Sequence, residues 1–122
     1  MPKGNSSKTL VKSRAAAFER QGGRCYYCDL PLWLDDRESF RARFALPSGA
    51  VDARRCTAEH LLARCDGGTN ASNNIVAACH TCNVGRHHRR VAHDPAHHRD
   101  YVRRRIAQGL WHPRHVLQAF SG

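Results

Sequence analysis

Two Cys-x-x-Cys pairs, Cys25/Cys28 and Cys79/Cys82, constrain this chain more than any other feature of its sequence. Each pair places two thiols on one tight turn, and four thiolates supplied in this way suit tetrahedral coordination of zinc. Because sulfur takes all four positions, such a zinc has no open site for substrate, and we expect it to be structural. Zinc binding is worth about 10–16 kcal/mol in zinc-finger peptides. It would therefore stabilise a chain of 122 residues, whose apolar core is necessarily modest.

The four cysteines have two alternative interpretations, a redox motif and unpaired buried thiols. A redox Cys-x-x-Cys ordinarily occurs once, within a thioredoxin-like βαβ pattern that this sequence does not show. Residues 29–78 separate the two pairs, a gap far longer than the roughly 15–20 residues of a simple zinc ribbon. A zinc ion bound by both pairs would therefore join the two ends of this long segment. Cys56 and Cys65 have no such partner, and we expect them to be packing thiols rather than ligands.

The charge balance indicates a polyanionic partner. The chain has 20 basic and 10 acidic residues and a formal net charge of +10. Of the basic residues 17 are arginine, whose planar guanidinium suits phosphate oxygens, although genome base composition can also enrich arginine. We expect DNA as the partner.

The sequence gives no sign of export or of a membrane segment. It has no run of about 18 apolar residues, and residues 1–13 lack the apolar centre of a secretory signal. We therefore expect a cytoplasmic protein with neither a membrane nor a small-molecule cofactor as partner. A reducing cytoplasm favours metal ligands over disulfides for the cysteines.

Periodicity and end signals predict an α+β fold. Residues 1–6 are expected to form a flexible tail, 7–92 the main domain, and 93–122 a helical extension packed on the core. Within the domain, 29–54 is the least readable part and is expected to hold a variable insertion. The predicted helices cover 7–21, 79–92, 94–109 and 113–120, and the predicted strands cover 57–62 and 75–78.

Between the two cysteine pairs lies a run of acidic, imidazole, glycine and amide residues. In chain order its elements are Glu59-His60, Gly67-Gly68, Asn74 and Cys79-x-x-Cys82-Asn83. Taken singly, a Glu-His pair is ordinarily a solvated surface feature, and Gly-Gly with Asn is ordinarily a turn. Their joint order, held between four cysteines, favours a functional site.

This order and spacing resemble the HNH nuclease family, in the branch with two zinc-binding Cys-x-x-Cys pairs. The resemblance covers about residues 10–90, with 29–54 only loosely matched. It implies a small zinc-stapled ββα-metal core with flanking N- and C-terminal helices, in which a hairpin carries the histidine and a helix carries the last ligand. Glu59 stands where the family most often has Asp, and Arg86 where it often has Lys.

The resemblance also implies a role for each residue in hydrolysing DNA phosphodiester bonds. His60 would be the general base, because a neutral imidazole can accept the proton of an attacking water. Glu59 and the side-chain carbonyl of Asn83 would hold a catalytic Mg²⁺ or another divalent metal, since hard cations prefer oxygen ligands. Asn74 would hold the loop and orient His60.

A basic stretch follows the motif. If the helix continues, Arg86, Arg89 and Arg90 share one face, and we expect them to contact the DNA backbone. A solvated charged face is the alternative. The adjacent histidine pairs at 87–88 and 97–98 are poor chelators on a helix, and we expect them to be surface residues.

Three functions are therefore open from sequence. The first is a metal-dependent HNH endonuclease with His60 as general base. The second is a zinc-stabilised nucleic-acid-binding module that has lost the chemistry. The third is an accessory subunit of a larger nuclease complex, docking through an exposed patch formed by Trp33, Trp111 and the insertion.

Overall fold

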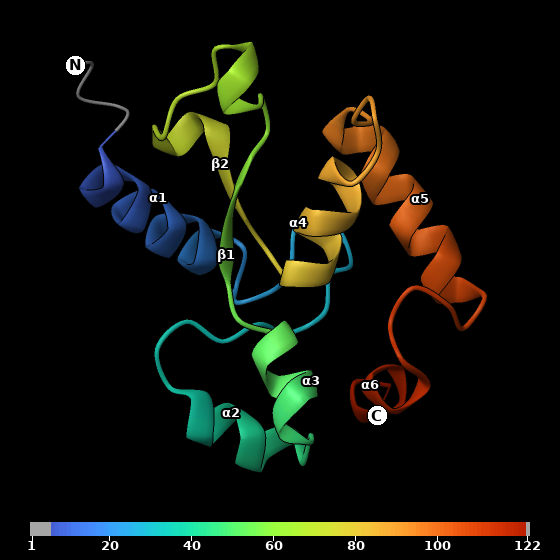
Figure 1. Ribbon diagram of the computed structural model, residues 1–122. Helices are drawn as coiled ribbons and strands as arrows, with labels where there is room; N and C mark the ends of the chain where they lie inside the picture. Colours follow the sequence, from blue (N-terminus) through green and yellow to red (C-terminus); the bar gives the residue numbers. More distant parts are fainter. Residues whose placement is uncertain (1–5, 122) are drawn as a thin grey trace.

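The computed structural model describes residues 6–121 and combines a two-stranded sheet with several short helices (Figure 1). The expected mixed helix-and-strand class is thus confirmed. In chain order the elements are α1 (Ser7–Arg20), α2 (Arg37–Phe44), α3 (Ser48–Ala53), β1 (Thr57–His60), β2 (Ile75–Ala78), α4 (His80–His87), α5 (Pro95–Ala107) and α6 (Arg114–Ala119). Short 3₁₀ turns at Arg64–Asp66 and Ser72–Asn74 lie in the loop between the strands. No helix within 6–121 has the length and apolar run needed to cross a bilayer.

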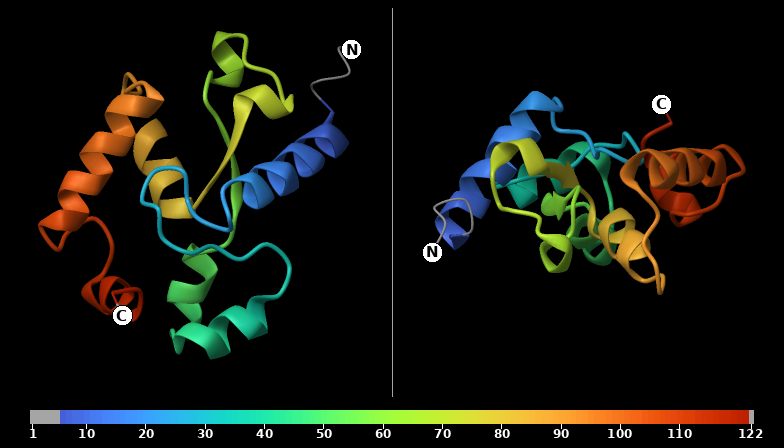
Figure 2. Two further views of the ribbon diagram at one scale, coloured as in Figure 1. Left: turned by 180° about the vertical axis from the view of Figure 1, so that it is seen from behind. Right: turned by 90° about the horizontal axis from the view of Figure 1, so that it is seen from above.

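The hairpin of β1 and β2 is the centre of the fold. The strands are antiparallel, with Thr57 opposite Ala78 and His60 opposite Ile75. Figures 1 and 2 show the hairpin between α1 on one side and α4 on the other, with α5 beyond α4. All of β2 is buried, whereas Glu59 is the buried position of β1. The hairpin therefore separates two environments, one facing α1 and one facing α4.

Helix α1 begins and ends as its sequence predicts. The Ser6 side chain accepts a hydrogen bond from the Thr9 amide and caps the helix, so Ser6 belongs to α1 and not to a tail. The rest of the expected tail lies outside the described residues. Gly22 adopts a φ of 65°, which ends the helix at little steric cost. On its surface Ala17 is buried, whereas Val11 is 53% exposed.

The apolar side chains form two cores. The first surrounds the cysteines and the hairpin, and the second lies beneath α2 and α3. Buried members of the first core are Ala17, Cys25, Tyr27, Cys28, Leu32, Cys56, Ala77, Ala78, Cys79, Cys82 and Val102. Buried members of the second are Phe40, Leu46, Val51 and Val116.

The segment 29–54 is folded into these cores. Asp36 caps α2 by accepting a hydrogen bond from the Ser39 amide, and α2 and α3 supply Phe40 and Val51 to the second core. Trp33 is partly buried against the second core, and its indole nitrogen donates to the Val51 carbonyl. Trp111 packs on the first core instead. The two tryptophans therefore do not share the exposed patch expected of an accessory subunit.

The C-terminal helices follow their end signals. Asp94 caps α5, Pro95 is its first residue, and Gly109, with a φ of 75°, follows its end. His98 and Val102 are buried on its inner side, which corrects the expectation that His98 is a surface residue. Because Val102 belongs to the first core and Val116 to the second, this segment packs on the rest of the chain.

Candidate functional site

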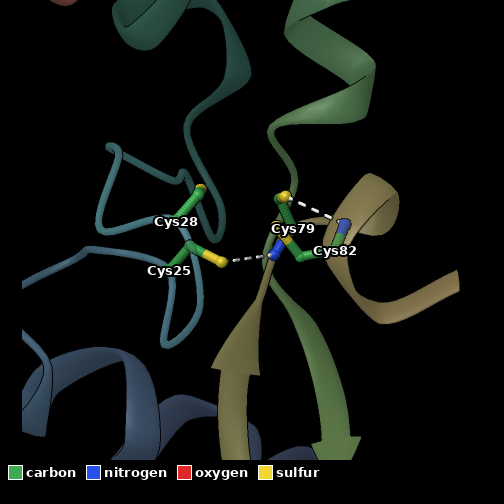
Figure 3. A group of neighbouring side chains, drawn as sticks. All are labelled: Cys25, Cys28, Cys79 and Cys82. Atoms are coloured by element: carbon green, nitrogen blue, oxygen red, sulfur yellow. Dashed lines mark hydrogen bonds between the residues drawn. The ribbon is translucent and has the colours of Figure 1, made fainter. Parts of the chain in front are cut away.

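The four cysteines of the Cys-x-x-Cys pairs form one buried cluster. The Sγ atoms of Cys25, Cys28, Cys79 and Cys82 all lie within 4.8 Å of one another (Figure 3). A zinc tetrahedron with Zn–S bonds of about 2.3 Å has sulfur–sulfur edges of roughly 3.8 Å. The cluster is already close to that arrangement, and four thiols are a donor set that suits zinc. The prediction that the two pairs come together is confirmed, and the cluster could hold a zinc ion.

Local backbone structure positions each pair. Cys25 and Cys28 lie on the turn that follows α1, where the Asp29 amide donates to the Cys25 carbonyl. Cys79 precedes α4, and its Sγ accepts a hydrogen bond from the Cys82 amide at 3.4 Å. The Cys79 amide in turn donates to Cys25 Sγ at 3.4 Å, which joins the two knuckles.

Two buried cations adjoin the sulfur cluster, and neither was predicted. Arg54, 1% exposed, directs Nη2 to Cys28 Sγ at 3.6 Å and also donates to the Pro31 and Leu30 carbonyls. His112 is also buried; burial lowers its pKa, but hydrogen bonds to Cys28 and Cys79 outweigh this and raise the pKa to about 9. Four thiolates around Zn²⁺ would carry a net charge of −2, and the Arg54 guanidinium supplies a buried positive charge beside them.

The remaining two cysteines lie outside the cluster. Cys56 is buried in the first core, as expected of a packing thiol, and burial raises its pKa to about 11 despite the nearby charges of Arg14 and Arg55. Cys65 is exposed, so the expectation that it packs is wrong. The reason is local, because Cys65 lies on a 3₁₀ turn in the loop between the strands.

On the α4 side of the hairpin, Glu59 is the centre of a buried polar group. Its side chain is 1% exposed. Its Oε2 accepts hydrogen bonds from the Tyr27 hydroxyl at 2.8 Å and from Arg86 Nη1 at 3.3 Å. Its Oε1 lies 2.8 Å from Nε2 of His87. Burial and the Glu59 charge raise the pKa of Tyr27, which keeps its hydroxyl protonated as a donor.

The Arg86 side chain is buried, contrary to the expectation that it shares an exposed face with Arg89 and Arg90. Only 6% of its side chain is exposed. Besides Glu59, its guanidinium donates to the main-chain carbonyls of His60, Leu61 and His93. The expected common face does not form because α4 ends at His87, and Arg89 and Arg90 lie beyond it on the exposed connection to α5.

His60 lies at the end of β1 and is oriented by a residue that the sequence did not indicate. Its Nε2 lies 2.7 Å from Asn70 Oδ1. Asn70 is itself held from both sides, because its Nδ2 donates to the Ser6 carbonyl and its own carbonyl accepts from the Ser13 hydroxyl. These partners are the N-cap and a central residue of α1. His60 therefore faces α1, whereas Glu59 faces α4.

Asn74 and Asn83 brace the hairpin at its two ends. The Asn74 side chain accepts from the Leu62 amide and donates to the Leu62 and Thr69 carbonyls, so it holds the loop as expected. It does not orient His60, whose ring is bound to Asn70 instead. The Nδ2 of Asn83 donates to Thr57 Oγ1 at 3.1 Å and to the Ala58 carbonyl at 3.4 Å.

Several contributors to these sites escaped prediction. His87 is exposed, as expected, but its contact with Glu59 was not predicted, although it lies four residues after Asn83 and thus on the same side of α4. That spacing is the one signal that could have identified it. Tyr27, Arg54 and His112 reach the sites through tertiary packing, for which the local sequence holds no signal.

Comparison with family models, with curated proteins and with solved structures found no match to this chain.

Proposed function

We propose that the chain is a metal-dependent endonuclease of the HNH type, hydrolysing phosphodiester bonds of DNA. The observation that carries this proposal is the 2.8 Å contact between Glu59 Oε1 and His87 Nε2. Glu59 directly precedes His60, whose ring is oriented by Asn70. The candidate ligand Glu59 and the candidate base His60 are thus consecutive residues of β1, and His87 of α4 completes the ligand pair. Titratable side chains that are gathered and held by hydrogen bonds in this way are candidates for a catalytic site.

Glu59 Oε1 and His87 Nε2 form the core of the proposed cation site. The buried side of the carboxylate is held by Tyr27 and Arg86, while the His87 side chain is 35% exposed, so a cation could enter from that side. Asn83 lies one turn earlier on α4, and its Oδ1 accepts no hydrogen bond from the described residues, which leaves it available as a third ligand. An imidazole ligand suits a later transition metal such as Co²⁺ or Ni²⁺ better than Mg²⁺.

The hydrogen-bond network defines which nitrogen of His60 acts as base. The Ser6 carbonyl can only accept, so the amide nitrogen of Asn70 faces it and Oδ1 faces His60. His60 Nε2 must then carry the ring proton, which leaves the lone pair of Nδ1 to accept a proton from water. Asn70 is thus a positioning residue that fixes the reactive tautomer.

The opposite directions of Glu59 and His60 suit the reaction. Consecutive residues of a strand point to opposite faces, so the base and the cation ligands flank the end of β1. An in-line displacement places the attacking water and the departing oxygen on opposite sides of phosphorus. His60 takes a proton from the attacking water on one side. A divalent cation held by Glu59 and His87 would neutralise charge on the phosphate and the departing oxygen on the other.

The sulfur cluster has a separate task. It ties the turn after α1 to the start of α4, and so fixes α4 relative to the hairpin that carries Glu59 and His60. We propose that it binds a structural zinc.

The test is cleavage of supercoiled plasmid by zinc-loaded protein with Mg²⁺, Mn²⁺, Co²⁺ or Ni²⁺ added. We expect nicking that depends on the added metal and falls about 100-fold or more in His60→Ala, a loss typical of removing a general base. His115→Ala is the matched control, because His115 is an exposed histidine of α6. Equal activity in the two variants would exclude His60 as the base.

One observation favours the second candidate, a zinc-stabilised binding module without catalysis. Arg86 already pairs with Glu59, so the carboxylate charge is balanced without a metal ion. Salt-dependent DNA binding by wild-type protein that cuts nothing with any of the four metals would support this candidate instead.

A further inference from the structure

A groove of about 280 Å³ lies between α1 and β1. It is lined by Leu10, Val11, Arg14, Arg55, Cys56, Thr57 and Ala58. Ala58 and His60 are two residues apart on the same strand, and alternate residues of a strand point to the same face. The bond from His60 to Asn70, which is tied to Ser13 of α1, also turns the ring toward α1. The groove therefore lies on the face of β1 that also carries His60.

Two arginines of this groove have no anionic partner. The ion pairs among the described residues involve Arg37, Arg41, Arg86 and His87, and neither Arg14 nor Arg55 is among them. Nε of Arg14 is buried and donates to no partner within the described residues. Arg55 is exposed, with its guanidinium 5.8 Å from the centre of the Trp33 ring. Both charges are available to an anion, in contrast to that of Arg86.

Apolar side chains complete the groove wall. Leu10 and Val11 lie on the α1 side, and Val11 is among the exposed large apolar residues of the chain. A nucleic-acid backbone alternates anionic phosphates with sugars that have apolar faces. Unpaired guanidinium groups beside exposed aliphatic carbon match that alternation better than they match a purely apolar ligand.

We propose that this groove binds the sugar–phosphate backbone of the nucleic-acid strand that enters the site at His60. Arg14 and Arg55 contact phosphates next to the one that is hydrolysed, and Leu10 and Val11 pack against sugars. The proposal rests on the proposed function and extends it, because it names the surface that holds the substrate in place of Arg86.

Its test is the salt dependence of DNA binding, which does not require catalysis. A fluorescein-labelled DNA duplex is titrated with zinc-loaded His60→Ala protein, without other divalent metals, at several salt concentrations. Adding Arg14→Gln and Arg55→Gln should weaken binding at least tenfold. It should also reduce the slope of log K against log salt by about 2, because each phosphate contact contributes about 0.9. Arg104→Gln with Arg114→Gln is the control, since it removes the same charge from exposed positions of α5 and α6.

A second variant covers the case in which the arginine pair is needed for folding. Val11→Glu adds a carboxylate at an exposed position of the groove and should weaken binding, whereas Leu110→Glu, at an exposed position after α5, should not. Binding by the groove variants that equals binding by their controls would overturn the proposal. If these variants lose binding but wild-type protein never cleaves, the groove stands and the proposed function fails. If wild-type protein cleaves and the groove variants bind like the controls, the reverse holds.

Discussion

The Nε2 atom of His60 lies 2.7 Å from Oδ1 of Asn70, on a side chain that is itself anchored to the start of α1. Helix α1 therefore takes part in setting the orientation of the proposed base. We predict that Asn70→Ala lowers kcat about 10- to 100-fold with little change in KM, because the imidazole loses its fixed orientation. Asn70→Asp should instead stabilise the protonated ring and move the acidic limb of the pH–rate profile to higher pH. A profile that does not move in Asn70→Asp would contradict this role.

His87 is predicted to be a cation ligand. His87→Ala should weaken binding of the activating metal at least tenfold, so the Mn²⁺ concentration that gives half-maximal nicking should rise by that factor. The neighbouring His88→Ala is the control, because His88 is exposed and follows the end of α4. Calorimetric titration of Mn²⁺ into His60→Ala protein gives the same comparison without turnover. Unchanged metal affinity in His87→Ala would remove this histidine from the site.

The ion pair of Arg86 and Glu59 is predicted to be essential for stability. Both side chains are almost fully buried, so Arg86→Met leaves the Glu59 carboxylate without its cation and should cost about 3–5 kcal/mol of unfolding free energy. Combining Arg86→Met with Glu59→Gln removes the orphaned charge and should restore much of the loss. Urea denaturation of the single and double variants measures both effects. A double variant no more stable than Arg86→Met would argue against a charge-based origin.

The cysteines are predicted to differ sharply in reactivity. In zinc-loaded protein at neutral pH, a thiol-alkylating reagent should modify Cys65 alone, since Cys65 is exposed. Cys56 stays unreactive because it is buried and its pKa, raised to about 11, leaves almost no thiolate. Mass spectrometry should show one adduct in native protein and six after chelation in denaturant. Rapid modification of any residue of the sulfur cluster in native protein would contradict zinc binding there.

Removal of the metal is predicted to unfold the chain. The first core is built around the four cysteines of the sulfur cluster, so a strong chelator should abolish the cooperative thermal transition seen by circular dichroism, and added Zn²⁺ should restore it. Metal analysis should give one zinc per chain. A transition that is identical with and without chelator would show that the cluster is not a structural metal site.

The parts of the fold that follow local rules could be predicted from sequence. Both strands and α5 lie where alternation, the Asp94-Pro95 start and Gly109 indicated, and the two cysteine pairs meet as their spacing implied. Helix α4 was predicted too long. Its end at His87 depends on Arg86 turning inward to Glu59 and to main-chain carbonyls, a tertiary choice that local propensity does not contain.

Within the candidate site, the sequence indicated which types of residue are present better than it indicated which side chains contact one another. Asn70 and Asn74 lie in the same loop, and only the fold reveals that the first binds His60 while the second braces Leu62. His87 was overlooked for a similar reason, since its contact with Glu59 requires α4 to lie beside β1.

The neighbours of the sulfur cluster determine where the chain can be truncated without disturbing the cluster. Arg54 follows the end of α3 and contacts Cys28 Sγ. Trp111 lies on the connection between α5 and α6, and its indole nitrogen donates to Cys82 Sγ at 3.3 Å. A truncation after residue 92, at the apparent end of the motif-bearing segment, would strip the sulfurs of that donor and of the His112 charge. Shortening the chain to its recognisable motif would therefore expose the sulfur cluster to solvent and chelators, and a stable fragment has to keep the C-terminal segment with Trp111 and His112.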